Sequence, residues 1–346
     1  MTGPVLNVMM ASGRGGLEQA ALDWHEGLRS QGASVTSAGR SGGWFMDRCP
    51  ATERAPFSTF GRFDPFIRWR LRGAAVGRAC ALLHGNRAME MFLRPMDGLC
   101  RVGVVHNFRY KPFVAKMDAL IAVSSGVAQA LARDYPQTPC VVVPNLVRAP
   151  AHVVRPLGGS PAQIVSLGRL HDNKDFGLLI RAFANLRRSG LEAQLTIGGE
   201  GPELDALQAL ALREGVAQSV SFPGWIGDRA AFFAKADLFV LSSRVEPFGI
   251  VVIEAMAHGV PVIATRTAGP LDIVSPDETG LLVAQGNLDE MSAALMRLVQ
   301  DPDQARRMGA QGRASVQERW SFSVVAQRMA QAVDELTAGS ARAHER

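Results

Sequence analysis

Residues 238–264 read LFVLSSRVEPFGIVVIEAMAHGVPVIA, and this stretch decides the fold class. The short apolar run Leu238–Leu241 is typical of a buried strand, and so is Val260–Ala264. Between them, a polar loop leads into a helix that ends at Gly259. A strand, a helix and a second strand in this order predict a parallel βαβ unit.

The same alternation runs through both halves of the chain. Short, wholly apolar segments separated by helical patterns predict parallel sheets that are covered on both faces. A helical pattern fills residues 288–336. The expected strands are 5–10, 34–37, 80–83, 102–105, 119–123 and 140–143 in the first half, and 164–167, 195–197, 220–222, 238–241, 260–264 and 281–283 in the second.

A crowded interval of proline and glycine separates the halves and marks a linker. We expect an α/β protein with two Rossmann-like, doubly wound domains, residues 1–150 and 158–320, joined by a linker over 146–161. The C-terminal helix, residues 321–338, is expected to complete the first domain. Ligands of such folds bind at the carboxyl ends of the strands, so the cleft across which the two domains face each other is the expected site.

Composition excludes several classes of protein. The chain has 346 residues, of which 47% are apolar and 20% charged, as in globular proteins. No apolar run reaches the roughly 18 residues of a membrane span. The chain has no basic residue before Arg14, and Asn7 interrupts the first apolar run, so we expect no secretory signal and a cytoplasmic protein. The four cysteines are too widely spaced for a zinc or redox motif, and free, mostly buried thiols are expected.

Positive charge is concentrated in the first half. Residues 1–155 carry 19 Lys+Arg against 10 Asp+Glu, whereas the remainder carries 18 against 22. The stretch Arg40–Gly77 does not fit the sheet pattern and is expected to be an insertion. Within it and just beyond, Arg54–Arg78 mixes arginine with aromatic residues. This mixture is compatible with an anionic membrane surface, with an anionic acceptor, or with a solvated loop whose phenylalanines face the core.

Several common nucleotide-binding and metal-binding motifs are absent from the sequence. No P-loop is present, and the glycines at 13, 15 and 16 lack the spacing of a dinucleotide fingerprint. Gly15 and Gly16 still precede a helix, where free amides can bind an anion; a tight turn without a ligand is the alternative. The Asp301–Asp303 stretch is interpreted as a helix start, and no metal is assigned.

The second half carries a sharper pattern. Gly168 and Arg169 end a strand, and Lys174 follows in a polar loop. Two cations at the mouth of a strand suit a diphosphate, although each alone would fit a solvated surface. The next strand ends in a turn with Gly199 and Gly201, which permits close approach of a ligand.

A second pattern contains two carboxylates. Glu246 precedes Phe248 and Gly249, whose amides begin the helix that carries Glu254. A buried, unpaired Glu254 would be costly. Accepting both hydroxyls of a ribose would remove that cost, and pairing with a neighbouring arginine is the alternative.

Together these motifs resemble glycosyltransferase family 4, a group of retaining, nucleotide-sugar-dependent enzymes with the GT-B fold. The resemblance rests on Gly-Gly-Leu-Glu at 15–18, Gly-Arg-Leu at 168–170 with Lys174, Gly-Glu-Gly-Pro at 199–202, Ala-Gly-Pro at 268–270, and Glu246 with Glu254 eight positions on. It departs from the family at Asp175, where a glycine is usual, and in Arg40–Gly77.

The resemblance implies roles in the second half. Arg169 and Lys174 would hold the donor diphosphate, with the glycines at 168, 199 and 201 close by. Glu246 would face the transferred sugar and Glu254 the ribose, with the amides of Phe248 and Gly249 near the phosphates.

In the first half, Gly15 and Gly16 would contact the phosphate. His106 would lie next to the donor sugar and count, with Arg169, Lys174 and Glu246, among the catalytic residues. His84, Asn86 and Arg87 are weaker candidates for the acceptor.

The expected function is transfer of a hexosyl group from a nucleotide diphosphate sugar to an acceptor hydroxyl, with retention and without a cofactor or metal. Bacterial cell-envelope polysaccharide, lipopolysaccharide or glycolipid synthesis is the expected setting, cytoplasmic or peripheral on the inner face of the cytoplasmic membrane. The acceptor is expected to be a saccharide or a lipid-linked saccharide. A nucleotide-sugar 2-epimerase of the same architecture is the alternative enzyme. A basic nucleic-acid-binding protein is the non-enzymatic alternative, but no binding motif supports it.

Overall fold

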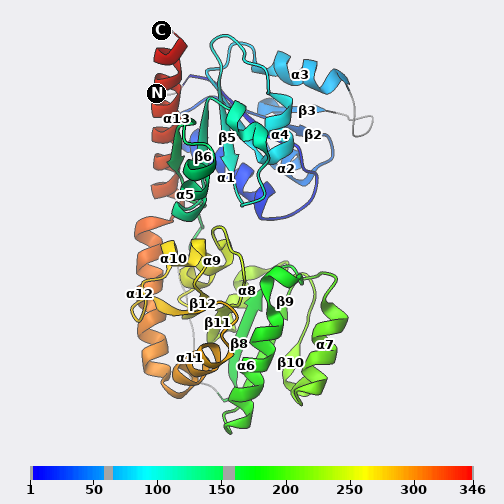
Figure 1. Cartoon of the computed structure of the whole chain (residues 1–346), viewed down its shortest axis with the longest axis vertical. Coiled ribbons are helices and arrows are strands. Elements are labelled where there is room, and N and C mark those ends of the chain that lie inside the picture. The colour runs from blue at the N-terminus through cyan, green and yellow to red at the C-terminus, as the bar shows by residue number, and fades with distance from the viewer. Residues whose placement is uncertain (1–2, 58–64, 151–159, 345–346) are drawn as a thin grey trace. The chain divides into compact units, whose positions relative to one another are not determined.

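The computed structural model describes residues 3–57, 65–150 and 160–344, without the side chains of Pro65 and of 341–344. The chain forms two compact units (Figure 1). Unit 1 contains residues 1–146 and 322–346, and unit 2 contains residues 147–321. The middle of the expected linker, residues 151–159, lies outside the described part.

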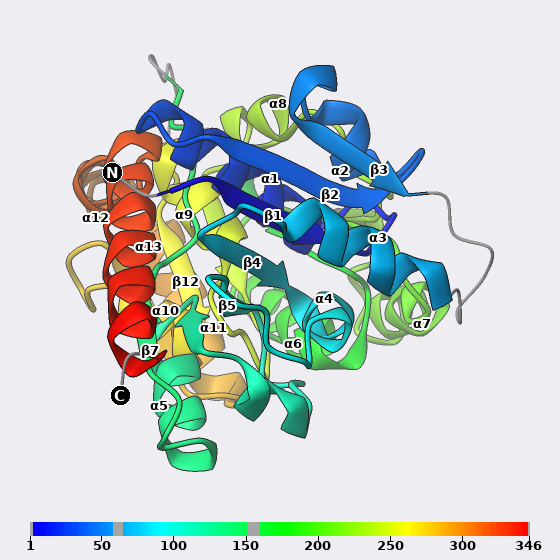
Figure 2. The same cartoon turned by 90° about the horizontal axis from the view of Figure 1, so that it is seen from above.

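Unit 1 is built on a parallel sheet of seven strands in the order β3-β2-β1-β4-β5-β6-β7. The central strands β1, β4 and β5 consist of buried residues only, as the apolar segments predict. Figure 2 shows β2, β1 and β4 side by side. The strands are β1 Val5–Met9, β2 Val35–Arg40, β3 Arg54–Phe57, β4 Cys80–His84, β5 Cys100–Val105, β6 Ala119–Ala122 and β7 Cys140–Val142.

Helices cover this sheet, and the last helix of the chain is one of them. Helix α13 packs against α1 and β5, and α1 also contacts α2. On another side, α4 contacts β4, β5 and α3. The helices of unit 1 are α1 Gly16–Ser30, α2 Trp44–Arg48, α3 Pro65–Ala75, α4 Gly85–Met91, α5 Ser125–Asp134 and α13 Phe322–His344.

The expectation of an insertion at Arg40–Gly77 is wrong for its described part. This stretch supplies α2, the edge strand β3 and α3, and β3 pairs in parallel with β2. The strand reads RAPF, and only Phe57 in it is buried. A proline is tolerated at a sheet edge, where one side of the strand needs no partner, and such a short edge strand has no apolar run to reveal it.

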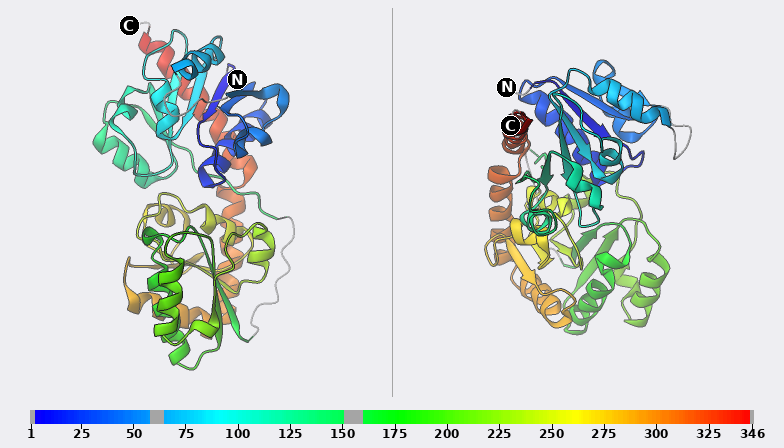
Figure 3. Two further views of the ribbon diagram at one scale, coloured as in Figure 1. Left: turned by 90° about the vertical axis from the view of Figure 1, so that its right-hand side faces the viewer. Right: turned by 45° about the horizontal axis from the view of Figure 1, so that its top comes forward.

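Unit 2 has a second parallel sheet, with six strands in the order β10-β9-β8-β11-β12-β13. Helices lie on both sides of it (Figure 3), with α6 against α7 and α11, and α9 against α10 and α12. Its elements are β8 Ala162–Leu167, α6 Phe176–Arg188, β9 Ala193–Gly198, α7 Leu204–Arg213, β10 Val220–Ser221, α8 Arg229–Ala234, β11 Leu238–Leu241, α9 Ile250–Ala257, β12 Val262–Thr265, α10 Ala268–Ile273, β13 Gly280–Val283, α11 Leu288–Gln300 and α12 Pro302–Arg319.

The C-terminal helical stretch consists of three helices. The first break is at Asp301, whose carboxylate accepts a hydrogen bond from the Gln304 amide at 2.8 Å and caps α12. This confirms the interpretation of Asp301–Asp303 as a helix start. The second break, at Trp320 and Ser321, separates α12 in unit 2 from α13 in unit 1.

Two doubly wound parallel sheets confirm the predicted fold class. All four cysteines are free, and three are fully buried, as expected. Of the helices in the described residues, none combines the length and the apolar character that crossing a membrane requires.

The strand orders locate the place where each sheet binds ligands. In unit 1 the direction of winding reverses between β1 and β4, and in unit 2 between β8 and β11. Such switch points leave a crevice at the carboxyl ends of the two strands, which is the usual ligand site of open parallel sheets.

Candidate functional site

The predicted residues of the second half gather at the switch point of unit 2. Gly168 and Arg169 directly follow β8, and Glu246 lies in the loop that follows β11. Because β8 and β11 are hydrogen-bonded neighbours, these two loops meet at one edge of the sheet.

Lys174 and Glu246 form the closest ionic contact across this edge. The Lys174 Nζ donates to Glu246 Oε2 at 2.5 Å, although the two residues are 72 positions apart. Their side chains are only 18% and 11% exposed, so solvent screens the pair weakly. The hydroxyl of Ser243 also donates to Glu246, at 3.4 Å. The structure therefore places Lys174, which is predicted to face the phosphate, beside Glu246, which is predicted to face the sugar.

Further bonds tie the two loops together. The backbone amide of Arg244 donates to the Asn173 carbonyl at 2.8 Å, and the Ser242 hydroxyl donates to the Lys174 carbonyl at 2.8 Å. Arg244 Nε also donates to Asp175 at 2.9 Å. Lys174 is thus held by its backbone as well as by its ammonium group.

Asp175 explains the departure from the family pattern. Its φ is +48°, in the left-handed region that favours glycine but that aspartate tolerates. The Asp175 carboxylate also accepts from the Leu178 amide at 3.4 Å and so caps α6. The aspartate keeps the turn that a glycine would make, and Arg244 balances the charge it adds.

Arg169 differs from Lys174, because no anion of the described residues lies beside it. It is exposed, and among residues 3–57, 65–150 and 160–344 no acidic side chain forms an ion pair with it. A guanidinium group in this position can give both of its donor edges to a phosphate.

Glu254 is held by an arginine, which is the alternative that the sequence left open. Arg229 Nη1, at the start of α8, lies 2.5 Å from both carboxylate oxygens of Glu254. The Glu254 side chain is 17% exposed and that of Arg229 39%. A ribose that bound to Glu254 would have to share the carboxylate with Arg229 or displace the guanidinium group.

The turn that contains Gly199 and Gly201 has a structural purpose. A Cβ atom on Gly199 would lie 1.9 Å from the Gly168 carbonyl oxygen, and one on Gly201 would lie 2.2 Å from the Leu170 carbonyl oxygen. The turns after β8 and β9 are therefore in backbone contact, and the Leu170 amide donates to the Glu200 carbonyl at 2.9 Å. This contact accounts for both glycines, and their part in ligand binding stays a prediction.

Replacing Gly201 by alanine is expected to lower the free energy of unfolding by about 1–3 kcal/mol, the usual cost of overpacking. The Gly227→Ala variant is the control, because a Cβ atom there meets nothing within 4 Å. Urea denaturation of both variants measures the difference. Equal stability of the two would show that the turn relaxes freely.

Phe248 and Gly249 bring the start of α9 to the same edge. Gly249 is the N-cap, with φ +94°, and Phe248 is buried. The start of α10 packs against this loop so closely that a Cβ atom on Gly269 would lie 1.8 Å from the Phe248 carbonyl oxygen. The first amides of α9 thus face the crevice side of the sheet, where a helix N-terminus favours an anion.

In unit 1, the predicted glycines lie at the corresponding switch point. Gly15 is the N-cap of α1 and Gly16 its first residue. The buried side chain of Glu18 lies against this turn, with a carboxylate oxygen 3.1 Å from the Cβ position of Gly15. The acid of the Gly-Gly-Leu-Glu motif therefore packs on the glycine turn.

The structure brings His84 and His106 together at the ends of β4 and β5. His84 Nδ1 lies 3.1 Å from His106 Nε2, and the rings stack with centroids 5.4 Å apart. Burial, and then the neighbouring His106, lower the pKa of His84 well below its usual value. Burial lowers the pKa of His106 to about 4. Both rings are neutral at pH 7.

The weaker acceptor candidates have local partners. The Asn86 side chain donates to the Arg109 carbonyl at 2.7 Å and accepts from the Lys111 amide at 3.2 Å. It therefore fixes the loop that follows His106. Arg87 is half-buried in α4.

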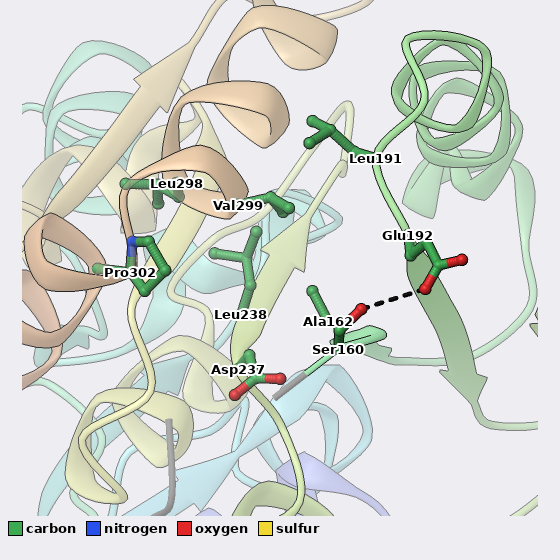
Figure 4. Close-up of a pocket in the computed structure, with 10 residues that line it drawn as sticks. Ser160, Ala162, Leu191, Glu192, Asp237, Leu238, Leu298, Val299 and Pro302 are labelled. Carbon is green, nitrogen blue, oxygen red and sulfur yellow. Dashed lines mark hydrogen bonds between the residues drawn. The ribbon is translucent and has the colours of Figure 1, made fainter. Parts of the chain in front are cut away.

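A cavity of about 250 Å³ lies at the opposite edge of the sheet in unit 2. Its lining includes Ala162, which begins β8, and Asp237, which precedes β11. In Figure 4, Ser160 donates to Glu192 at the cavity wall, at 3.1 Å. The cavity holds none of the predicted site residues. Within the described part of the chain, no cluster of three His, Cys, Asp or Glu residues could hold a metal.

Three residues that contact predicted site residues or their neighbours were not identified from the sequence. Arg229 and Arg244 pair with Glu254 and Asp175 from distant positions, and no local pattern announces such pairs. Asn7 had a signal, because it is a lone amide inside an apolar strand. A buried amide needs partners, and one of its partners is His84.

A family comparison identifies part of the chain. Residues 149–315 match the model of the glycosyl transferases group 1. These residues form a glycosyl transferases group 1 domain. The match covers nearly all of unit 2 and confirms the resemblance inferred from the motifs.

Curated relatives of this chain are named glycosyltransferases. The GDP-mannose-dependent alpha-(1-6)-phosphatidylinositol monomannoside mannosyltransferase of Mycobacterium tuberculosis (strain ATCC 25618 / H37Rv) is 38% identical over 183 residues, covering 50% of this chain and 47% of the relative. The lipopolysaccharide core biosynthesis glycosyltransferase LpsE of Rhizobium meliloti (strain 1021) is 35% identical over 162 residues, covering 47% and 46%. The chain spans about half the length of the curated relatives it matches.

Solved structures share the fold of the whole chain. Anabaena Alr3699/HepE in complex with UDP and glucose has a TM-score of 0.81 at 18% identity, over 96% of this chain and 99% of that one. The apo form of the lipopolysaccharide outer core galactosyltransferase WaaB has a TM-score of 0.75 at 19% identity, over 96% and 99%. These likenesses confirm the GT-B fold.

Proposed function

We propose that this protein is a retaining glycosyltransferase, which moves a hexosyl group from a nucleotide diphosphate sugar to an acceptor hydroxyl. The observation that carries the proposal is the group of Arg169, Lys174 and Glu246 at the switch point of unit 2, with Glu254 on the adjoining helix. These residues offer two cations to a diphosphate and two carboxylates to hydroxyl groups. The group 1 domain and its curated relatives support the same reaction class.

The diphosphate binds between Arg169 and the start of α9. Arg169 is exposed and forms no ion pair with an acidic residue in the described part of the chain, whereas Glu246 already partly neutralises Lys174. The donor therefore brings two negative charges to a site with one uncompensated guanidinium, one compensated ammonium and the amides of α9. These groups offset much of the diphosphate charge, and on this proposal the reaction uses no resident metal or cofactor.

Transfer breaks the bond between the anomeric carbon and the diphosphate oxygen and forms a bond to the acceptor oxygen on the same face of the sugar. The departing phosphate oxygen takes the acceptor proton. Lys174 and Arg169 stabilise the negative charge that grows on the leaving group, and this stabilisation is larger in the transition state than in the bound donor. Glu246, fixed by Lys174, accepts hydrogen bonds from sugar hydroxyls.

The relatives narrow the substrate classes. One relative is named for GDP-mannose and a phosphatidylinositol mannoside, another for the lipopolysaccharide core, and a structural neighbour is described with UDP and glucose. We propose a GDP- or UDP-linked hexose as donor and a saccharide or lipid-linked saccharide of the cell envelope as acceptor.

A two-stage experiment tests the proposal. Thermal unfolding is followed with GDP, UDP, ADP and their hexose conjugates, because a ligand that binds the folded state raises the melting temperature. The stabilising donor is then incubated with saccharide acceptors, and NMR determines the anomeric configuration of the product. Transfer with retention supports the proposal. Release of an isomerised sugar without transfer would instead identify an epimerase, and inversion would contradict the mechanism.

The acceptor side is proposed to meet the inner face of the cytoplasmic membrane through α3. Ile67 and Leu71 of this helix are buried, whereas Phe66 and Trp69 are 68% and 75% exposed. Arg68 and Arg70 flank the aromatic side chains and are exposed. Aromatic rings between guanidinium groups fit the interface of an anionic bilayer.

Several other described residues of the basic aromatic segment Arg54–Arg78 have partners within the protein, which is why we propose α3 as the membrane contact. Phe57 is in the core, and Arg54 and Arg72 donate to backbone carbonyls. Phe60, Arg62 and Phe63 lie outside the described residues.

A double variant tests the membrane contact. Replacing Phe66 and Trp69 by alanine is expected to weaken binding to anionic phosphatidylglycerol vesicles by about tenfold or more, because two exposed aromatic side chains lose their insertion area. Leu212→Ala is the control, since Leu212 is 72% exposed in the other unit. Vesicle flotation at low salt measures binding. If the wild type does not bind anionic vesicles, or the double variant binds as well as the wild type, α3 is not the docking element.

A further inference from the structure

A line of buried polar side chains crosses unit 1 at its switch point. It starts at Asn7, which is fully buried in the middle of β1 among apolar neighbours. Asn7 Nδ2 donates to the Ala21 carbonyl at 2.9 Å and to Ser37 Oγ at 3.4 Å. Asn7 Oδ1 accepts from His84 Nε2 at 2.8 Å. Both ends of the amide are therefore satisfied, as burial demands.

The partners of Asn7 fix which way its amide points. The Ala21 carbonyl oxygen has no proton to donate, so the nitrogen of the amide must face it. The opposite orientation would set two oxygens 2.9 Å apart inside the core. Oδ1 consequently faces His84, and because Oδ1 only accepts, Nε2 of His84 must carry the proton.

The tautomer of His84 determines the tautomer of His106. His84 is buried and neutral at pH 7, so a proton on Nε2 leaves Nδ1 bare. The bare Nδ1 lies 3.1 Å from His106 Nε2, and it can only accept. His106 Nε2 must then be the donor.

We propose that Asn7 is a positioning residue that, through His84, holds His106 in the tautomer whose Nδ1 accepts a hydrogen bond. His106 is half-buried at the end of β5, whereas Asn7 and His84 are sealed in the core. The ligand group that suits a bare ring nitrogen is a hydroxyl, which must donate to it. The assignment of this hydroxyl to the donor sugar or to the acceptor rests on the proposed function. The assignment of the tautomer does not depend on that function.

The sheet register explains why the hydrogen bonds from Asn7 through His84 to His106 form at this place. Asn7 is paired with Leu82 of β4, and Met9 with His84. Side chains alternate along a strand, so His84, two residues beyond Leu82, projects from the same face as Asn7. Ser37 is paired with Asn7 on the other side and lies on that face too.

Nitrogen NMR on the whole protein tests the tautomer without substrate. With ¹⁵N-labelled histidine at pH 7, the ring shifts distinguish protonated from bare nitrogens, and His84→Gln and His106→Gln assign the signals. We expect His84 and His106 each to carry the proton on Nε2 in the wild type. A proton on Nδ1 of His106 would overturn the proposal.

Asn7→Leu tests the role of Asn7, with Ser37→Ala as the matched control. Leucine removes the acceptor, so we expect both rings to become mixtures of tautomers. Ser37→Ala disturbs the same buried line but keeps the contact between Asn7 and His84, and we expect the wild-type tautomer. A single unchanged tautomer in Asn7→Leu would show that His84 does not take its orientation from Asn7. Should the leucine variant not fold, Asn7→Ala replaces it.

Measurement of kcat tests whether the tautomer of His106 affects sugar transfer. Asn7→Leu is expected to lower kcat about tenfold, the loss of one hydrogen bond in the transition state, while the affinity for the nucleoside diphosphate is unchanged. Unchanged kcat, together with scrambled tautomers, would refute the use of Nδ1 in transfer. If the wild type transfers no sugar at all, the proposed function fails, and the NMR result still decides the tautomer.

Discussion

Lys174→Met is expected to lower kcat by about 10²- to 10³-fold, the range found when one group that stabilises developing charge is removed. Methionine keeps an unbranched side chain and removes the ammonium group. The effect on binding of the free nucleoside diphosphate should be smaller, because Arg169 and the amides of α9 remain. Steady-state transfer kinetics and thermal shift with the nucleotide measure the two effects.

The contact between Lys174 and Glu246 complicates the interpretation of this loss of kcat. Removal of the Lys174 ammonium group leaves the Glu246 carboxylate, which is 11% exposed, without its cationic partner. The effect of Lys174→Met in a Glu246→Gln background shows which role Lys174 has. If Lys174 acts on the leaving group, Lys174→Met should cost about 10²-fold in the Glu246→Gln background as well. If Lys174 only neutralises Glu246, the second substitution should cost nothing further. Arg188→Met, which breaks an exposed ion pair with Glu214, is the control for loss of a surface cation.

The fold could be predicted from the sequence because it depends on local patterns. Each central strand is a short and mainly apolar run, and each sheet is covered on both faces, so the runs stand out wherever the strand is buried. The pattern failed at β3 for the same physical reason. Arg54–Phe57 lies at the edge of the sheet, three of its four residues are not buried, and it contains a proline.

The candidate site could be predicted only as far as its residues follow strand ends. Gly168, Arg169 and Glu246 do so, and the neighbouring strands β8 and β11 bring them together. Pairs such as Arg229 with Glu254 depend on where α8 and α9 lie in space, and no spacing in the sequence encodes that. Asp175 shows the opposite case, in which an unexpected residue type preserves the backbone turn through its tolerance of positive φ.

The second large effect concerns Glu254 and the ribose. The proposed contact predicts that wild-type protein binds a ribonucleoside diphosphate more tightly than its 2′,3′-dideoxy counterpart by about 10²-fold or more, because two hydrogen bonds to a charged group, each contributing about 1.5–3 kcal/mol, are lost. In Glu254→Gln this preference should shrink to a few-fold, mainly through weaker binding of the ribonucleotide. Isothermal titration with both nucleotides measures the preference directly.

Arg229 provides the comparison that decides between ribose binding and a purely structural ion pair. Arg229 Nη1 is 2.5 Å from both oxygens of Glu254, so a structural pair would make the two single variants behave alike. If Glu254 binds the ribose, Arg229→Met should keep the preference for the ribonucleotide, because the carboxylate stays in place, and only Glu254→Gln should lose it. Equal binding of both nucleotides by the wild type, or a preference that survives in Glu254→Gln, would leave Glu254 as the partner of Arg229 alone and remove it from the donor site.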